Sequence, residues 1–318
     1  MIVTVTLNAA IDRTLTVPNF QRGQRHRASA GVTLAGGKGI NVARALKALG
    51  VPVVATGLVG GSTGSRIVEA LTHEAILNDF VHIDGESRTS TAVVDPTGGA
   101  YTEINEWGPT VTTEELDTLL EKLRYLTQDA ELVVFAGSLP RDVEDDFYAE
   151  AVRELGKRHV SSVLDTEGEP LRLGVEAEPF LVSPNQAEAE ALVGQEFHDD
   201  EDFRVALDSI AEMGPRNVLI TTDEGCVALL REEKAEPVRY RAQAPKVDPV
   251  STVGSGDVLF AGFVAARLDG RSDEEALRAA VAAGAASTLE IGAGRFEPRE
   301  AGRLIGSVDV AQLQAVGS

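Results

Sequence analysis

The sequence predicts an α/β fold in which helices flank both sides of a doubly wound, mostly parallel sheet. Two observations predict it: apolar, β-branched runs recur along the chain, and segments with helical spacing of apolar residues separate them. Several runs are nearly continuous rather than alternating, which is typical of strands buried on both faces of a parallel sheet. The runs are IVTVTL from Ile2, VVATGLVG from Val53, LVVFAG from Leu132, VSSVLD from Val160, PFLVSPN from Pro179 and NVLITT from Asn217.

Among the predicted helices between these strands, INVARALKALG from Ile40 is the clearest. Its apolar residues recur at helical spacing and a glycine follows them, as at many helix C-termini. These positions are Val42, Ala43, Leu46, Leu49 and Gly50.

Two segments, residues 14–35 and about 88–108, depart from this alternation. They show two-residue alternation, with turn residues at Pro96, Gly98 and Gly99. They predict a small antiparallel sheet that projects from the main sheet and either closes as a lid or pairs with a second subunit. Because no repeat or linker interrupts the chain, residues 1–318 are predicted to form one domain with this lid inserted.

Composition limits the function classes. Fifty acidic residues against 29 Lys and Arg give a net charge of −21, which repels nucleic acids and anionic membranes. No apolar run approaches the ~20 residues needed to span a bilayer, and the N-terminus lacks the features of a signal peptide. The single cysteine, Cys226, cannot form an internal disulfide, so we expect a cytoplasmic protein.

The basic residues are unevenly distributed between types, with 23 Arg and six Lys. Acidic excess with scarce Lys resembles proteins of salt-loving organisms, in which a screening length of ~3 Å at 1 M salt reduces self-repulsion. An ordinary acidic cytosolic protein explains the composition equally well.

The stretch VGSGDVLFAGF from Val253 joins a glycine-rich turn to a predicted helix. Backbone N–H groups of Gly254, Ser255 and Gly256, together with the helix dipole, predict a cradle for an anion. Asp257, in the first turn beside that cradle, can accept a proton from an attacking hydroxyl during phosphoryl transfer. The alternative is that Asp257 only caps the helix. The predicted buried stripe of this helix is Leu259, Phe260, Phe263, Val264 and Leu268.

A second glycine-rich turn, AGGKGIN from Ala35, precedes the helix described above. Its glycines allow close backbone approach, while a lysine and an asparagine offer a charge and an amide to a phosphate or to sugar hydroxyls. It is not a Walker A loop, because Val32 and Gly39 occupy the places of its first glycine and its Ser or Thr. The alternative is a plain strand-to-helix turn. The residues are Gly36, Gly37, Lys38, Gly39 and Asn41.

Asn185 and Glu188, in SPNQAE from Ser183, lie three residues apart at a predicted helix start. They could position a water-coordinated Mg²⁺ near nucleotide phosphates, or they could simply form a capping box. Asn8 and Asp12 follow the first predicted strand, at the sheet edge where ligands bind in open α/β folds. The lid segments also contain three cations that either bind an anion or are simply solvated: Arg25, Arg27 and Arg88.

Other catalytic motifs fail. The chain has no HExxH, no CxxC pair and no GxSxG, and a GxGxxG pattern fails because Leu259 stands where its third glycine belongs. Zinc hydrolases, serine esterases and Rossmann dehydrogenases are therefore disfavoured.

Taken together and in this order, TLNAAID, AGGKGINVAR, FAGSLP, SPNQAE and VGSGDVLFAGF resemble the PfkB branch of the ribokinase-like sugar kinases, from Ile2 to about Ile291. Within the branch, the chain is most similar to 1-phosphofructokinases and tagatose-6-phosphate kinases. Lys38 supports this, since the related 6-phosphofructokinases often carry glycine there.

The resemblance implies ATP and Mg²⁺ as cofactors, with Asp257 as the base and Gly254, Ser255 and Gly256 around the transferring phosphoryl group. For the substrate it implies contacts from Asp12, Gly36, Gly37, Asn41, Lys38, Arg25, Arg27, Arg88 and Ser138. For the nucleotide it implies contacts from Asn185, Glu188 (to Mg²⁺ through water), Thr222, Gly225, Gly284 and Ser287.

The implied reaction is ATP-dependent phosphorylation of a ketohexose phosphate, D-fructose 1-phosphate to fructose 1,6-bisphosphate. Tagatose-6-phosphate kinase or 6-phosphofructokinase activity is an alternative, and a non-catalytic sugar-phosphate-binding regulator is an alternative from another class. Two departures leave the phosphate donor open: Ser183-Pro184-Asn185 where relatives often read KPN, and TTDEG, with Asp223 where a glycine is expected. Family analogy predicts a homodimer through the lid sheets.

Overall fold

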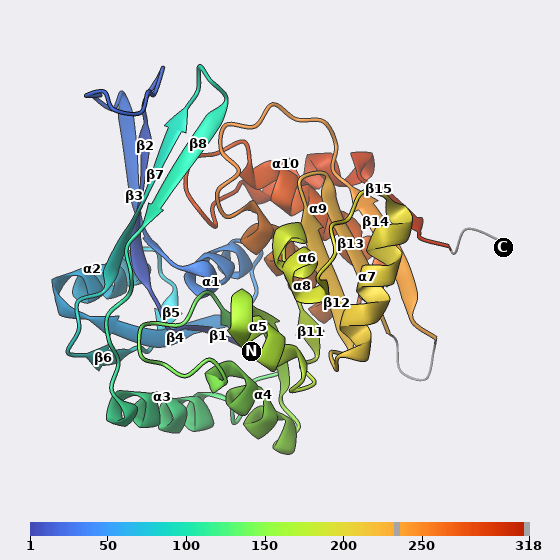
Figure 1. The fold of residues 1–318 in the computed structure, drawn as a ribbon, viewed down its shortest axis with the longest axis horizontal. Coiled ribbons are helices and arrows are strands. Elements are labelled where there is room, and N and C mark those ends of the chain that lie inside the picture. The colour runs from blue at the N-terminus through green and yellow to red at the C-terminus, as the bar shows by residue number, and fades with distance from the viewer. Residues whose placement is uncertain (232–235, 315–318) are drawn as a thin grey trace.

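The computed structural model describes residues 1–231 and 236–314, and within them an eleven-stranded sheet forms the centre of the molecule (Figure 1). The strand order is β15-β14-β13-β12-β11-β10-β9-β1-β4-β5, with β6 paired to β4. The strands are β1 (Ile2–Thr6), β4 (Val53–Gly60), β5 (Leu77–Asn78), β6 (Val81–Ile83), β9 (Leu132–Ala136), β10 (Ser161–Asp165), β11 (Leu181–Val182), β12 (Asn217–Thr222), β13 (Gly225–Leu230), β14 (Val238–Gln243) and β15 (Asp309–Gln312).

The pairs from β5 through β12 are parallel, whereas β12, β13, β14 and β15 pair antiparallel. All six strands expected from the apolar runs are present, as β1, β4, β9, β10, β11 and β12. The prediction of a doubly wound, mostly parallel sheet is therefore confirmed. The antiparallel extension from β13 to β15 was not among the expected strands.

Helices cover both faces of this sheet because its strands are apolar on both sides. In β9, Val134 belongs to one core, while Val133 and Phe135 belong to the other. No helix in the described part of the chain is long and apolar enough to cross a membrane. The first core contains residues of α1 (Lys38–Ala48), α2 (Gly61–His73), α8 (Ser255–Leu268), α9 (Asp273–Ser287) and α10 (Pro298–Leu304), which η1 (Ile305–Ser307) follows. The second contains residues of α3 (Thr113–Leu126), α4 (Phe147–Lys157), α5 (Gly168–Val175), α6 (Gln186–Val193) and α7 (Asp200–Glu212).

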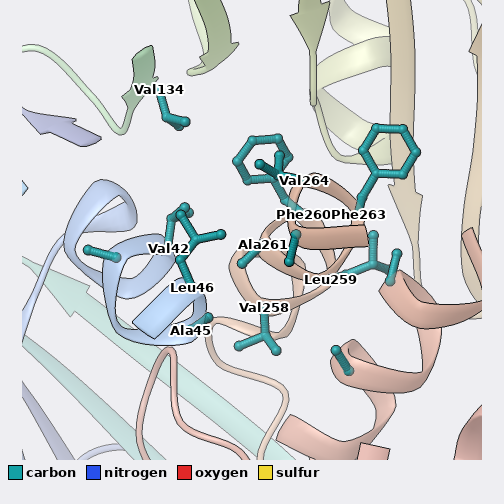
Figure 2. Packing of buried hydrophobic residues seen from close by; sticks show 14 of the residues in the cluster. Val42, Ala45, Leu46, Val134, Val258, Leu259, Phe260, Ala261, Phe263 and Val264 are labelled. Carbon is teal, nitrogen blue, oxygen red and sulfur yellow. The ribbon is translucent and has the colours of Figure 1, made fainter. Parts of the chain in front are cut away.

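The helices that follow the two glycine-rich turns, α1 and α8, pack against each other in the first core. Figure 2 shows Val42 and Leu46 of α1 facing Ala261 of α8. Helix α8 is buried along most of its length. The predicted stripe is buried except at Leu268, which is 42% exposed because it is the last residue of the helix. This packing holds the two helix starts beside each other.

The expected lid is a separate four-stranded sheet with the order β3-β2-β7-β8, which projects from the body in Figure 1. The pairs β2–β3 and β7–β8 are antiparallel, but β2 and β7 are parallel, so the prediction of a purely antiparallel sheet is wrong at its centre. The hairpins β2–β3 and β7–β8 join edge to edge through β2 and β7, which run in the same direction. Local turn patterns do not encode this pairing. The strands are β2 (Ala10–Thr16), β3 (Ala30–Gly36), β7 (Arg88–Asp95) and β8 (Ala100–Asn105), so the lid begins at residue 10 rather than 14.

Candidate active site

A cavity of about 1110 Å³ lies between the lid and the carboxyl ends of the parallel strands. It is the place where open α/β sheets bind ligands. The cavity is also large enough for two small molecules at once, since typical ligand sites occupy ~300–1,000 Å³. The candidate site residues singled out from sequence that line it are Asn8, Asp12, Gly37, Lys38, Asn41, Arg88, Ser138, Asn185, Thr222, Gly225, Gly254, Ser255, Gly256, Asp257 and Gly284.

Both glycine-rich turns place a helix N-terminus at this cavity. Gly37 and Gly254 are the N-caps of α1 and α8, with φ of 104° and 76°, and no side chain in the described part of the protein caps either helix. The first-turn N–H groups are therefore not occupied by a capping side chain, and the dipoles of two helices favour negative charge in the space between them. Such an arrangement can bind an anion.

Asp257 lies in the first turn of α8 and is 7% exposed. Its Oδ2 accepts a hydrogen bond of 2.8 Å from Nδ2 of Asn41. It does not cap the helix, because Gly254 is the N-cap. Burial, reinforced by the carboxylate of Asp165, raises the pKa of Asp257 to about 7 despite the opposing effects of Lys38 and Asn41. A carboxylate with this pKa is suited to accept a proton near neutral pH.

Arg44 of α1 orients the amide that binds Asp257. Its Nη1 donates to Oδ1 of Asn41 at 3.3 Å, so the amide nitrogen of Asn41 is the group turned toward Asp257. The guanidinium is itself held by Glu74, with Nε–Oε2 and Nη2–Oε1 distances of 2.5 and 3.0 Å, and by the carbonyl of Ala35 at 2.7 Å. Buried polar networks of this kind fix one geometry because each member is satisfied.

Lys38 is bound by carboxylates. Its Nζ lies 2.7 Å from Oδ1 of Asp165 and 3.3 Å from Oε1 of Glu188. Burial alone would lower the pKa of Lys38, but these carboxylates raise it, so the amine stays charged. Burial and the nearby Asp165 raise the pKa of Glu188, against the effect of Lys38. Lys38, which we expect to contact a substrate phosphate, is thus also bound to Glu188, the residue predicted to contact Mg²⁺ through water.

The Asn185–Glu188 pair forms the capping box that was the structural alternative for this motif. Oδ1 of Asn185 accepts from the N–H of Glu188 at 2.9 Å, and Oε2 of Glu188 accepts from the N–H of Asn185 at 2.8 Å. The cap leaves Oε1 of Glu188 for Lys38. Glu188 does not itself line the cavity, although Asn185 does.

Arg88, at the start of β7, brings a positive charge to the lid side of the cavity. Its Nε donates to the carbonyl of Asn8 at 3.2 Å and its Nη1 to Oγ of Ser90 at 3.1 Å. Nδ2 of Asn8 donates to Oγ of Ser138 at 3.2 Å. Burial raises the pKa of Asp12, and the charge of Arg88 opposes that shift.

Four further predicted residues do not line the cavity. Gly36 instead makes room for Asp12, because a Cβ at Gly36 would overlap its carboxylate. The hydroxyl of Ser287 donates to the carbonyl of Gly284 at 2.7 Å, the local bond that serine often makes in helices. Arg25 and Arg27 lie between β2 and β3 and are exposed to solvent. In the single chain, these four residues therefore do not contact the cavity.

Asp165 was missed at the sequence level. It is the last residue of β10, is 5% exposed, and lines the cavity beside Lys38. The signal was present, because it is the first charged residue after the apolar run VSSVL and therefore marks the ligand-binding edge of the sheet.

Residues 2–300 match the model of the pfkB family carbohydrate kinases. The chain belongs to the pfkB family. It is 35% identical over 291 residues to a 1-phosphofructokinase of Borreliella burgdorferi, covering 91% of this chain and 92% of that protein. It is 29% identical over 317 residues to a tagatose-6-phosphate kinase of Staphylococcus epidermidis, covering 98% of this chain and all of that protein (100%).

A solved structure, phosphofructokinase-2 of Escherichia coli in complex with substrates and products, superimposes with a TM-score of 0.87 at 27% identity. The match covers 96% of this chain and 98% of that chain. As a pfkB carbohydrate kinase the chain is a phosphotransferase, and ATP is the phosphate donor of this family.

Proposed function

We propose that this pfkB kinase transfers the γ-phosphate of ATP to the free primary hydroxyl of D-fructose 1-phosphate, giving fructose 1,6-bisphosphate and ADP. One observation carries the proposal: a buried carboxylate, Asp257, with a pKa raised to about 7, lies beside two helix N-termini in one cavity. The choice of sugar phosphate follows the higher identity to a 1-phosphofructokinase than to a tagatose-6-phosphate kinase.

In the proposed step, Asp257 takes the proton of the sugar hydroxyl. The oxygen of that hydroxyl forms a bond to the γ-phosphorus, in line with the breaking bond between the γ-phosphorus and the leaving ADP oxygen. The N–H groups at the start of α8 stabilise the negative charge on the oxygens of the transferring phosphoryl group. Asn41 keeps the carboxylate oriented, because its amide donates to Oδ2 of Asp257 at 2.8 Å. The sugar and the nucleotide are held in reacting positions by opposite ends of the cavity.

The substrate's existing phosphate would be bound by Arg88, Ser138 and Lys38, with Asp12 and Asn41 on the sugar hydroxyls. Lys38 is already bound to Asp165 and Glu188, so a phosphate would join an ion-pair network rather than meet a free amine. Arg88 is the less encumbered cation, since its two hydrogen bonds go to a carbonyl and a hydroxyl. We therefore assign the main phosphate contact to Arg88.

The nucleotide would lie near Asn185, Thr222, Gly225 and Gly284, which line the remainder of the cavity. Magnesium fits this region, because Asp165 and Glu188 provide hard oxygen ligands, and Mg²⁺ commonly takes one or two carboxylates with water and phosphates. No cluster of three or more His, Cys, Asp or Glu side chains that could hold a metal ion occurs in the described residues. When bound, Mg²⁺ would neutralise charge on the ATP phosphates.

The proposal is tested by measuring ADP formation with MgATP and a panel of fructose 1-phosphate, fructose 6-phosphate and tagatose 6-phosphate. We expect the highest kcat/KM for fructose 1-phosphate. Asp257→Asn is expected to lower kcat by roughly 10²–10⁴-fold with little change in sugar KM. Unchanged turnover in that variant would refute the role of Asp257. A preference for tagatose 6-phosphate would show that the assignment of fructose 1-phosphate as the substrate is wrong. Binding of a sugar phosphate without turnover would favour a non-catalytic regulator.

Arg88 is tested separately through the two Michaelis constants. Arg88→Ala is expected to raise the sugar-phosphate KM ~10- to 100-fold, because a hydrogen-bonded charge pair is lost, and to leave the KM for ATP nearly unchanged. Arg13→Ala is a matched control, since Arg13 is an exposed residue of the same lid sheet that does not line the cavity. Equal increases in both constants would contradict the assignment.

A further inference from the structure

A second cavity, of about 390 Å³, lies between α3, β9 and α4, on the side of the sheet covered by the second core. These two helices lie at the lower edge of the view in Figure 1, away from the lid. Its lining is largely apolar, with Leu123 from α3, Val133 and Phe135 from β9, and Phe147 and Leu155 from α4. None of these residues belongs to the active-site cavity.

Charged side chains surround the apolar lining of this cavity. The carboxylates are Glu150 and Glu154, and Glu154 lies 3.5 Å from Nζ of Lys157. Cations outnumber carboxylates there by four to two, although the whole chain carries a net charge of −21. The cations are Arg124, Arg153, Lys157 and Arg158.

Two of these cations have no partner among the described residues. Within residues 1–231 and 236–314, the guanidinium groups of Arg124 and Arg153 make no hydrogen bond or ion pair. Arg158, in contrast, is oriented by its bonds to Oγ1 of Thr127 at 3.4 Å and to the carbonyl of Arg124 at 3.2 Å. The edge of the cavity therefore offers two unneutralised guanidiniums next to an apolar interior.

We propose that this cavity binds a small amphipathic anion, a medium-chain carboxylate, with its chain among the apolar residues and its carboxylate at Arg124 and Arg153. The volume lies in the range of small-molecule sites, which are mostly apolar with a few polar groups that fix orientation. An Arg fork matches a carboxylate in shape and charge. The net negative charge of the whole chain repels anions. Such a ligand therefore binds where nearby cations outweigh that repulsion.

Titration calorimetry of the full chain with decanoate, below the concentration at which it forms micelles, tests the proposal. We expect saturable binding at one site per chain. Octanoate is two methylenes shorter and is expected to bind roughly 15-fold more weakly, since each buried methylene contributes about a fourfold change in affinity. Weak binding at many sites would show detergent-like adsorption and would overturn the proposal.

Variants separate the anion contact from the apolar contact. The double variant Arg124→Ala/Arg153→Ala is expected to weaken decanoate binding at least ~5-fold, and Ala151→Trp, which fills the cavity from α4, to abolish it. Arg66→Ala, at an exposed arginine of α2 remote from this cavity, is the control and should bind as the wild type does.

If Ala151→Trp does not fold, the arginine double variant still decides the outcome. Binding that survives unchanged in the double variant would refute the anion site. Self-association of the wild type that Ala151→Trp abolishes would instead identify a second copy of the chain as the occupant, and would also overturn the proposal. Neither result bears on the proposed kinase activity, because no residue varied here lines the active-site cavity.

Discussion

At the scale of single residues, the site is governed by where charges are buried. Asp257, Asp165 and Lys38 lie within one electrostatic network, in which burial and one carboxylate raise the pKa of Asp257 while the lysine opposes that shift. Such perturbed groups in a cavity are typical of catalytic sites. The raised pKa has a cost for the fold, because an ionised Asp257 is less favourable in the folded than in the unfolded chain.

Asp257→Asn is therefore expected to stabilise the protein while it removes activity. The pKa of Asp257 is raised from 3.8 to about 7, so its favourable contribution is present at low pH and is lost as pH rises toward 7. The neutral amide avoids that loss. We expect a gain in unfolding free energy on the order of 1–4 kcal/mol at pH 8, measured by urea denaturation.

The gain should shrink steadily as pH is lowered from 8 toward 4, because wild-type Asp257 then becomes protonated in the folded state. The kcat/KM of the wild type should fall over the same range below pH 7, since a protonated acid cannot act as a base. A gain in stability that is the same at pH 8 and pH 4 would contradict this account of Asp257.

At the scale of elements, the N-termini of α1 and α8 form the centre of the candidate site. Gly254 shows why the turn before such a helix matters. Its φ of 76° lies in the left-handed region, and an added Cβ would lie 2.9 Å from the Cα of Ala293. Gly254→Ala is expected to destabilise the fold by ~1–3 kcal/mol and to lower kcat, because the turn that presents the N–H groups of α8 must shift. Thermal unfolding and steady-state kinetics measure the two effects.

Gly302→Ala is the matched control. Gly302 lies inside α10, and no described neighbour is within 4 Å of the position its Cβ would take. Alanine there should stabilise the protein by ~0.5–1 kcal/mol, because it reduces the freedom of the unfolded chain. Should Gly254→Ala behave like Gly302→Ala, the special role of the turn before α8 would be wrong.

At the scale of the whole molecule, the net charge of −21 acts on the stability of the compact state. Like charges repel more strongly in the folded than in the expanded chain, and salt screens that repulsion. We expect the Tm at pH 7.5 to rise by roughly 3 °C or more between 10 mM and 1 M NaCl. At pH 5, close to the sequence pI of about 4.6, the same step should raise Tm much less.

A fall in Tm with salt at pH 7.5 would show that ion pairs such as Arg172–Glu169 outweigh the repulsion.

The predicted homodimer through the lid sheets, the cytoplasmic location and the salt-loving source all stay predictions. The exposed lid strand β8 and the exposed Arg25 and Arg27 are where such a dimer would be examined first.

Much of the fold and part of the site were predictable because they are encoded locally. Apolar runs identify buried strands, and the glycine turns before α1 and α8 identify helix starts that accept an anion. Residues in those motifs, such as Gly37 and Asp257, line the cavity. Local bonding also explains why Ser287 does not line the cavity, since its hydroxyl bonds within its own helix.

The amino-acid sequence by itself determined which segments become buried strands and which turns present N–H groups, because these depend on neighbours a few residues apart. Only the tertiary structure decided the partners of the charges. Asn41 meets Asp257 across 216 positions and Lys38 meets Asp165 across 127. The parallel pairing of β2 and β7 has the same origin. Contacts so distant along the chain arise from packing of whole elements, and no local pattern carries them.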